Sequence, residues 1–253
     1  MIKVGYDAGH GGFGVTPGKR SPDGEYEWDF NNKVAIAFAN ELSLYQGVTS
    51  KRFDDPSGKS DISLTDRTDG ANGWGADYYI SFHHNANTSN WGNWTGVETY
   101  VYLNNRNTQS GKFAEAIHPA VVKAYGLSDR GIKEANFHIV RETKMPSILI
   151  EGGFMDSTID IKKLRDDQVL ANAGKMIAQA FAEFVGLKKI SFVEEDIELV
   201  NFLNDTGRKE AKQLIKKGVK EGIFVDEHKN VDQYDDTQLL SYALAYVNRK
   251  NKE

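Results

Sequence analysis

The chain has no cysteine among its 253 residues. This absence excludes disulfide bonds and thiolate metal ligands, so any bound metal ion would have to be held by His, Asp or Glu. The sequence also has no apolar run approaching the roughly 20 residues of a transmembrane helix, and its N-terminus lacks the apolar segment of a secretory signal. We therefore expect a protein that is made in the cytoplasm without a signal peptide and does not insert into membranes.

The formal net charge is weakly negative, at −5. A chain of this sign is not expected to bind nucleic acid or other polyanions through a general electrostatic attraction. Its length is long for one compact domain and suits one large domain followed by a small one.

Hydrophobic periodicity predicts strands that alternate with helices over residues 1–186. The predicted strands are residues 2–6, 48–53, 78–84, 96–103 and 147–150, and the predicted helices are residues 26–45, 108–125 and 167–185, with a short helix that begins at Leu64. Pro119 is expected to bend or break the second of these long helices. This alternation predicts an α/β fold, a three-layer sandwich with a mostly parallel sheet flanked by helices.

The composition changes after Leu187, where a short polar junction leads into a highly charged segment. Residues 195–221 and 237–249 have amphipathic patterns that favour helices. We therefore predict a first domain over residues 1–187 and a separate, small, mainly helical domain over residues 192–253.

Three polar residues lie just at or past the ends of predicted strands, namely His10, His83 and Glu151. In open α/β sheets, sites form beyond the carboxyl ends of the strands, so we expect these side chains to meet. A carboxylate at the end of a buried strand is unfavourable unless it is paired, protonated or near a metal. The placement of Glu151 therefore indicates a role beyond that of a surface acid.

Each candidate also has an ordinary structural interpretation. His10 could be a loop histidine with a nearby hydrogen bond, and Glu151 could pair with a Lys or Arg. Glu25 and Glu27 precede the long first helix, where an acid commonly complements the helix dipole. No local metal motif joins these residues, so their spacing alone does not establish a metal site.

Alternation along the third predicted strand separates His83 from His84. Successive side chains point to opposite faces of a sheet, so only one of the two histidines can point into a given site. A structural role is the simpler interpretation of whichever histidine points away.

Segments in the same order along residues 1–186 resemble those of the zinc-dependent N-acetylmuramoyl-L-alanine amidases often called amidase type 3. These segments are Asp7-Ala8-Gly9-His10-Gly11-Gly12, Glu27-Trp28-Asp29-Phe30-Asn31, Leu64-x-x-Arg67 with Ala71-Asn72 and Ala76-Asp77, Ser81-Phe82-His83-His84-Asn85-Ala86, and Pro146-Ser147-Ile148-Leu149-Ile150-Glu151-Gly152-Gly153-Phe154. Asp129-Arg130-Gly131-Ile132-Lys133 and Asn136-Phe137 also stand where the family has similar segments.

This resemblance implies one Zn²⁺ per chain, bound by His10, Glu27 and His83, with Glu151 as the catalytic acid/base. It also implies the reaction, hydrolysis of the amide bond between N-acetylmuramic acid and L-alanine in bacterial peptidoglycan. Two neutral histidines and a carboxylate suit that chemistry because they leave a zinc position open for water. One departure is visible, since Gly152 stands where the family often has Thr or Ser.

Four further residues are expected to contact substrate. Arg67 and Asn85 belong to the segments that resemble the family. Trp91 and Trp94 follow His83 closely, and their flat rings could pack on sugar or peptide. The alternative is that both tryptophans only fix their own loop.

Two other classes of function stay open on the sequence. One is a zinc peptidase that cuts within the stem peptide, and the other is a non-catalytic wall-binding protein with the same fold. A wall-lytic chain without a signal peptide is typical of a phage endolysin that reaches the wall after release during lysis. A mother-cell autolysin of a spore-forming bacterium would show the same features.

The second domain resembles surface-layer-homology wall anchors in its plan of helix, Gly-Ile, loop and helix over residues 211–224 and 234–246. We expect it to bind cell wall, with oligomerisation as a homodimer or a stabilising role as the alternatives. Because this segment is itself acidic, binding would need a shaped pocket or a local cationic cluster. Such a cluster is predicted on one helix face at Lys209, Lys212, Lys216 and Lys220.

Overall fold

A computed structural model describes residues 1–190, 205–221, 231–234, 236, 239–240 and 242–243. The chain divides into two compact units, Met1–Ser191 and Phe192–Glu253. Most of the amphipathic stretch predicted over residues 237–249, and the start of the one predicted over residues 195–221, fall outside the described residues.

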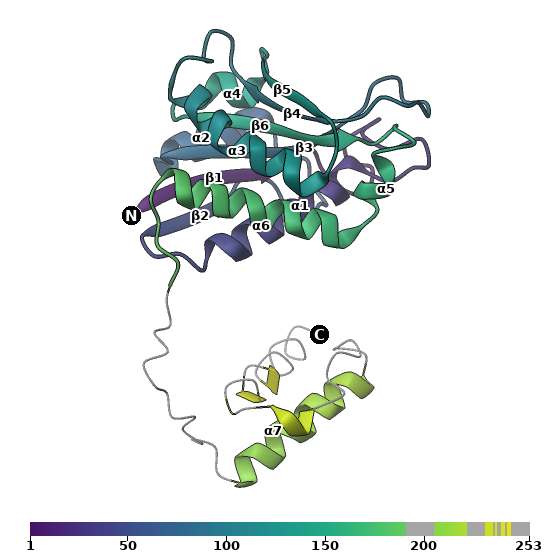
Figure 1. The fold of residues 1–253 in the computed structure, drawn as a ribbon, viewed down its shortest axis with the longest axis vertical. Helices are drawn as coiled ribbons and strands as arrows, with labels where there is room; N and C mark the ends of the chain where they lie inside the picture. The colour runs from purple at the N-terminus through teal and green to yellow at the C-terminus, as the bar shows by residue number, and fades with distance from the viewer. Residues whose placement is uncertain (191–204, 222–230, 235, 237–238, 241, 244–253) are drawn as a thin grey trace. The chain divides into compact units, whose positions relative to one another are not determined.

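The larger unit is built on a six-stranded sheet in the order β2-β1-β3-β6-β4-β5 (Figure 1). Its strands are β1 (Ile2–Ala8), β2 (Val48–Arg52), β3 (Tyr78–Asn85), β4 (Val97–Val101), β5 (Asp129–Glu134) and β6 (Ser147–Phe154). Neighbouring strands are parallel except for β4 and β6, which are antiparallel. The carboxyl ends of β1, β3 and β6 therefore lie at one edge of the sheet.

Helices cover both faces of this sheet, so the predicted three-layer α/β sandwich is confirmed (Figure 1). They are α1 (Glu27–Leu42), α2 (Leu64–Trp74), α3 (Gln109–Tyr125), α4 (His138–Glu142), α5 (Ile161–Leu164) and α6 (Asp167–Phe184). On one face, α1, α3 and α6 pack together over buried side chains such as Phe82 and Ile150. On the other face, Tyr79 packs against Ala71 of α2 and Ile139 of α4.

Two details of the sequence prediction are wrong. The helix α3 runs without a break through Pro119, because Pro119 and the preceding turn at Glu115 lie on the exposed side of the helix. Water can satisfy the carbonyl that loses its helical partner there. The sixth strand also continues beyond the apolar run, so Glu151 lies within β6 rather than past the end of its strand. His83 lies near the carboxyl end of β3, as predicted.

The described part of the smaller unit contains α7 (Asp205–Lys220) and a short 3-10 helix, η2 (Val231–Gln233). A small core joins these elements to helical residues nearer the C-terminus, and it consists of Ala211, Ile215, Val231, Leu239 and Ala243. Among the helices of the described residues, none has the length and apolar character needed to cross a membrane.

Candidate metal centre and active site

The three side chains expected to bind zinc lie together at the carboxyl edge of the sheet. His10 follows β1, Glu27 begins α1, and His83 belongs to β3. The Nε2 atom of His10 lies 3.1 Å from Oε2 of Glu27, and Nδ1 of His83 lies 3.0 Å from Oε1 of Glu27. One donor atom from each side chain lies within 4.8 Å of the other two. Two imidazoles and a carboxylate at this spacing form a donor set that suits Zn²⁺.

The loop after β1 carries His10 in a backbone conformation with a φ of 67°. This left-handed region is unfavourable for a residue other than glycine unless its surroundings hold it. The preceding Gly9 is required by space, because a Cβ atom there would lie 2.0 Å from the ring of His83. The close approach of the two histidines therefore depends on a glycine at position 9.

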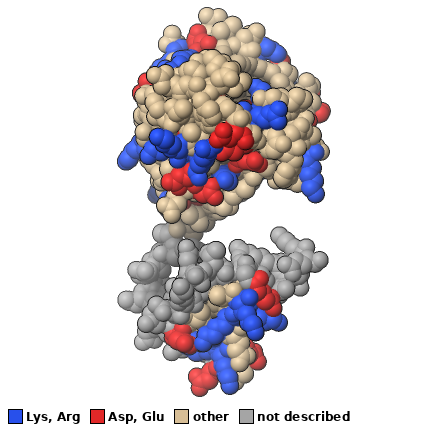
Figure 2. Space-filling model, turned by 90° about the vertical axis from the view of Figure 1, so that its right-hand side faces the viewer, with Lys and Arg blue, Asp and Glu red and all other residues tan. Residues whose placement is uncertain are grey.

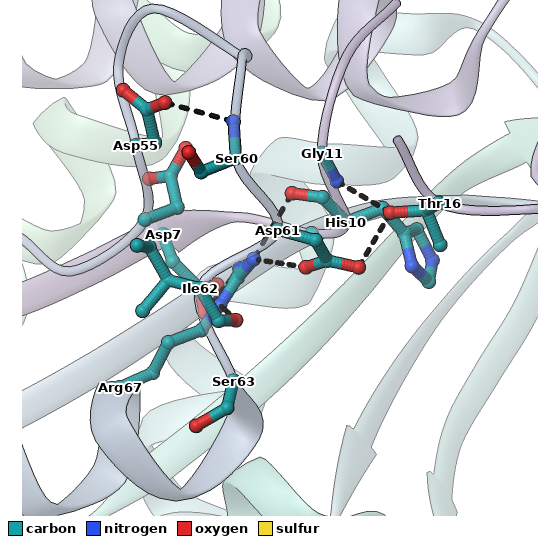
Figure 3. Close-up of polar contacts among 12 residues, drawn as sticks. Asp7, His10, Gly11, Thr16, Asp55, Ser60, Asp61, Ile62, Ser63 and Arg67 are labelled. Carbon is teal, nitrogen blue, oxygen red and sulfur yellow. Dashed lines mark hydrogen bonds and ion pairs between the residues drawn. The ribbon is translucent and has the colours of Figure 1, made fainter. Parts of the chain in front are cut away.

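The side chain of Arg67 is hydrogen-bonded to the loop that carries His10 (Figure 3). Its side chain is buried, with 1% of the residue exposed. The guanidinium has five N–H groups, and it donates to the side chains of Asp7 and Asp61 and to the backbone carbonyls of Ala8, His10 and Ile62. These contacts suit a role in positioning the His10 loop rather than the substrate contact expected from the sequence.

A second set of hydrogen bonds, through Thr16 and Asp61, holds the same loop (Figure 3). The hydroxyl of Thr16 donates to Asp61 and accepts from the backbone N–H of Gly11 at 2.8 Å. Asp61 thus links Thr16 to Arg67, and the loop is tied at two points to the N-terminal end of α2.

Glu27 is almost fully buried, with 3% of the residue exposed. Besides the two imidazoles, its Oε1 accepts from the backbone N–H of His84 at 3.2 Å. Burial alone would raise the pKa of this carboxyl, but hydrogen bonds with His10 and His83 hold the pKa well below its usual value. The carboxylate is therefore ionised at neutral pH, as a metal ligand must be.

Glu25, the other candidate acid, points elsewhere. Its carboxylate pairs with the guanidinium of Arg165 at 2.5 Å and accepts from the hydroxyl of Ser21. Of the two acids, only Glu27 faces the histidines.

The two imidazoles differ in their electrostatic surroundings. Burial lowers the pKa of His10 more than the attraction of Glu27 raises it. Burial also acts to lower the pKa of His83, but attraction to Glu27 and Glu151 outweighs this, and the pKa is raised. Because His83 has the higher pKa, protonation competes with metal binding more strongly at His83 than at His10.

His84 points to the opposite face of the sheet, as side-chain alternation requires. Its Nδ1 lies 2.7 Å from Oδ1 of Asn31, and its Nε2 lies 3.0 Å from the hydroxyl of Tyr125. Burial lowers the pKa of His84 to about 3, so the ring is neutral. The neighbouring Gly152 leaves room for this contact, because a Cβ atom there would lie 2.4 Å from the Tyr125 hydroxyl.

We expect the metal-free protein to lose stability through His84 as the pH falls from 7 to 5. The folded-state pKa is about 3, whereas the unfolded value is about 6.5. Below the unfolded value the unfolded chain binds more protons, so stability falls as the pH falls from about 6.5 towards about 3. At pH 5 the titration of His84 lowers the free energy of unfolding by roughly 2 kcal/mol.

The measurement is urea unfolding at both pH values in the presence of a chelator. The variant His84→Gln should lose less stability than the wild type between pH 7 and pH 5, because Gln does not titrate. Equal losses in the two proteins would contradict this interpretation of His84.

Glu151 lies next to this cluster on β6. In the sheet it is paired directly with His83 of β3 and with Glu98 of β4. Its Oε2 is buried and makes no hydrogen bond with the described residues. Burial raises the pKa of Glu151 to about 8, with Glu27 and Glu98 adding to the effect against the attraction of His83. A carboxyl group with a pKa near neutral pH can both accept and donate a proton.

The sequence interpretation missed Glu98. It is a buried acid in the fourth strand, and it accepts hydrogen bonds from Arg130, Lys133 and Tyr100. A lone acid in a short β-branched strand, followed two residues later by a tyrosine on the same face, is the signal that could have revealed it.

A pocket of about 500 Å³ opens over these residues. Its polar lining includes His10, Lys19, Glu27, His83, Asn85 and Glu151. Its apolar lining includes Leu64, Phe137, Ile139, Leu149 and Met155. A pocket that combines apolar walls with convergent polar groups is a common form of small-ligand site. Asn85, one of the residues predicted to contact substrate, lines it.

The loop that carries the two tryptophans is fixed by the buried Asp156. Its Oδ2 accepts three successive backbone N–H groups, from residues 87–89, and its Oδ1 accepts the indole N–H of Trp94 at 2.8 Å. Trp94 therefore anchors its own loop. Trp91 keeps an exposed face beside the guanidinium of Arg165, which lies 5.8 Å from the ring centroid.

The arrangement joins a candidate metal centre, a carboxyl group with a raised pKa and a pocket that opens over both. Comparison with known proteins identifies the family of the chain. The profile of the N-acetylmuramoyl-L-alanine amidase family matches residues 4–183.

Individual relatives support the same assignment. The sporulation-specific N-acetylmuramoyl-L-alanine amidase of Bacillus subtilis (strain 168) is 36% identical over 198 residues, which is 76% of this chain and 71% of that protein. An endolysin of Bacillus phage SPP1 is 32% identical over 194 residues, 74% of this chain and 68% of the endolysin. The catalytic domain of CwlV, an N-acetylmuramoyl-L-alanine amidase from Bacillus (Paenibacillus) polymyxa var. colistinus, superposes with a TM-score of 0.66 at 29% identity, covering 74% of this chain and 100% of that domain. The chain belongs to the N-acetylmuramoyl-L-alanine amidase family.

Proposed function

We propose that this chain hydrolyses the amide bond between N-acetylmuramic acid and L-alanine in bacterial peptidoglycan. The observation that carries the proposal is one pocket that contains His10, Glu27 and His83 together with Glu151 on the adjacent strand. Membership of the amidase family and the names of its relatives support this bond and this polymer.

We propose one Zn²⁺ per chain, bound by His10, Glu27 and His83. The donor chemistry fits, because both oxygens of the ionised Glu27 face an imidazole nitrogen and the cluster opens to the pocket on one side. When bound there, zinc would supply Lewis-acid polarisation of the scissile carbonyl and of the attacking water.

Glu151 would act as the acid/base of the reaction. The bond between the lactyl carbonyl carbon and the alanine nitrogen breaks, and the oxygen of water is added to that carbon. Glu151 takes a proton from the water and delivers one to the leaving amine of L-alanine. Its raised pKa and its unpaired Oε2 support this role, and Asn85 offers its amide to substrate from the end of β3.

Digestion of purified cell walls tests the proposed function. Mass spectrometry of the soluble products should show intact stem peptides with a free N-terminal L-alanine, and muramic acid without a peptide. Shortened stem peptides would indicate a zinc peptidase instead. Binding to walls with no release of fragments would indicate a non-catalytic wall-binding protein.

The biological setting that suits this chain is lysis from within a cell. The relatives include both an endolysin of a phage and a sporulation-specific amidase of a host. We propose that the protein reaches its wall after release during lysis, either as a phage endolysin or as a mother-cell autolysin.

We propose that the second unit holds the enzyme to the wall. On its described surface Arg208, Lys209, Lys212 and Lys216 of α7 line a hollow of about 480 Å³ that also contains Asp232. Figure 2 shows the concentration of Lys and Arg on this unit. Lys212 and Lys216 lie 3.4 Å and 3.6 Å from the carboxylate of Asp232, and such exposed ion pairs are weak enough to be exchanged for an external anion.

We expect the Glu151→Gln chain to bind walls at least about tenfold more tightly than the same chain ended at Ile190, because a second attachment point raises avidity. Cosedimentation with walls measures this difference. High salt should weaken wall binding if the charges of Arg208, Lys209, Lys212 and Lys216 are responsible for it. Wall binding should persist at high salt if a shaped pocket is responsible. If both proteins bound walls equally, and if the full chain were a dimer but the truncated chain a monomer, the second unit would serve to form a homodimer and not to bind the wall.

A further inference from the structure

We propose that Arg130 and Lys133, held in place by Glu98, form a subsite for a carboxylate of the stem peptide. The inference rests on the proposed function and extends it to the choice of substrate. The subsite would lie beside Glu151, on the peptide side of the bond that is cut.

The first observation is an excess of positive charge around one buried acid. The side chain of Glu98 is 2% exposed, whereas those of Arg130 and Lys133 are 37% and 38% exposed. Both cations donate to the same oxygen, Oε1, and the hydroxyl of Tyr100 donates to Oε2. Burial raises the pKa of Glu98, but these hydrogen bonds outweigh burial and lower it. An ionised acid beside two cations leaves one positive charge uncompensated.

The second observation is that the guanidinium of Arg130 is held in a fixed position. It lies over the ring of Phe154, 5.0 Å from the centroid. Its aliphatic stem rests on Gly96, where a Cβ atom would lie 2.6 Å from Cγ of Arg130. Glu98 engages only Nε, and no described residue accepts a hydrogen bond from the two terminal amino groups. A fixed guanidinium with a free outer edge matches the two oxygens of a carboxylate.

The third observation places this cluster next to the reacting groups. Glu98 is the direct sheet partner of Glu151, so the two side chains share a face. The amide of Asn85, which lines the pocket, lies 3.4 Å from Oε2 of Glu98. On the other side, Tyr100 contacts the ring of Phe137 at the pocket wall, with 5.0 Å between centroids.

The distance from the reaction centre indicates which part of the substrate is recognised. β5 lies two strands from β6, which is about 10 Å, and an extended peptide covers that distance in about three residues. Beyond L-alanine, the second stem residue is a glutamate linked through its side chain, which leaves an α-carboxylate unless it is amidated. The third residue can carry another carboxylate. The peptide would then run from Glu151 towards β5, with the sugar on the opposite side.

Synthetic muramoyl tripeptides test the subsite. The set consists of N-acetylmuramoyl-L-Ala-γ-D-Glu-L-Lys with both carboxyl groups free, with only the glutamate α-carboxyl amidated, and with only the terminal carboxyl amidated. The full zinc-loaded chain should cleave the free form about tenfold or more faster in kcat/KM than the form amidated at the recognised carboxylate. The difference should appear in KM rather than in kcat, and the comparison of the two amides identifies the residue.

In Arg130→Gln the ratio of kcat/KM for free over amidated substrate should fall to about one. The matched control is Arg106→Gln, which removes an exposed arginine that follows β4 at the opposite edge of the sheet and pairs with Glu115. The control should keep the wild-type ratio. A wild type that does not discriminate, or an Arg130→Gln variant that keeps the preference, would overturn the subsite.

A binding measurement keeps the inference separate from the proposed reaction. Calorimetry with the tripeptide L-Ala-γ-D-Glu-L-Lys and its amides requires no turnover. A preference for the free carboxylate that Arg130→Gln abolishes supports the subsite even if no muramoyl substrate is cleaved. Equal affinities for all forms would refute the subsite even if the amidase reaction is confirmed.

Discussion

Replacing Glu151 by Gln should lower kcat about 10²–10⁴-fold, the usual contribution of a general acid/base. Gln has nearly the same shape and cannot exchange a proton, and the unpaired Oε2 of Glu151 means that no hydrogen bond to the described residues is lost there. We therefore expect the variant to fold and to retain one zinc per chain. Release of stem peptides from purified walls measures the rate, and metal analysis of the same sample measures zinc.

The dependence of kcat/KM on pH provides a second test of Glu151. The acidic limb of kcat/KM should disappear with Glu151, because its deprotonated form starts the reaction. The control is Glu115→Gln, which removes an exposed acid from α3 on the other face of the sheet. If Glu151→Gln retained activity within a few fold of the wild type, the acid/base would have to be sought among the other carboxylates.

Replacing His83 by Ala should remove zinc and activity together. Loss of an outer partner of a metal ligand already costs 10–100-fold in affinity, so loss of a ligand should exceed about 100-fold. Competition with a chromogenic chelator measures the affinity. Glu27→Gln should behave in the same way, because a neutral amide replaces the ionised ligand between the two imidazoles.

The matched controls are the neighbouring residues that the structure turns away. His84→Ala should keep its zinc but lose about 1–3 kcal/mol of stability, since Asn31 and Tyr125 lose a buried partner. Glu25→Gln should keep both zinc and activity. Zinc loss in His84→Ala with retention in His83→Ala would reverse the assignment of the two histidines.

The fold and the central residues were accessible from sequence for simple geometric reasons. Apolar periodicity reports which residues are buried, and burial fixes most of the elements of a layered α/β unit. Strand alternation alone separates the two adjacent histidines, and the structure places His83 and His84 on opposite faces accordingly. Which one faces the cluster, and that Glu27 rather than Glu25 completes it, came from the family resemblance.

The residues that sequence reasoning missed or misjudged depend on contacts between distant segments. The role of Glu98 depends on its contacts with Arg130 and Lys133, and β5 brings these two residues to Glu98 only in the observed strand register. Trp94 was expected at the substrate, but its indole N–H is used by Asp156, 62 residues away. A sequence pattern cannot show such pairing, because strand order and register are set by the packing of the whole sheet.

The position of β6 has a consequence for the order in which the protein is made. β6 is the last strand of the sheet in the chain, yet it lies inside the sheet, between β3 and β4. Because a ribosome adds about 5–20 residues per second, Glu151 follows His83 by about 3–14 s. During that interval the nascent chain already contains the three residues of the candidate metal centre, but the strand that will lie between β3 and β4 is missing. If Glu151 is the acid/base, we expect hydrolytic capacity to arise late in biosynthesis, when β6 enters between β3 and β4 and completes the sheet.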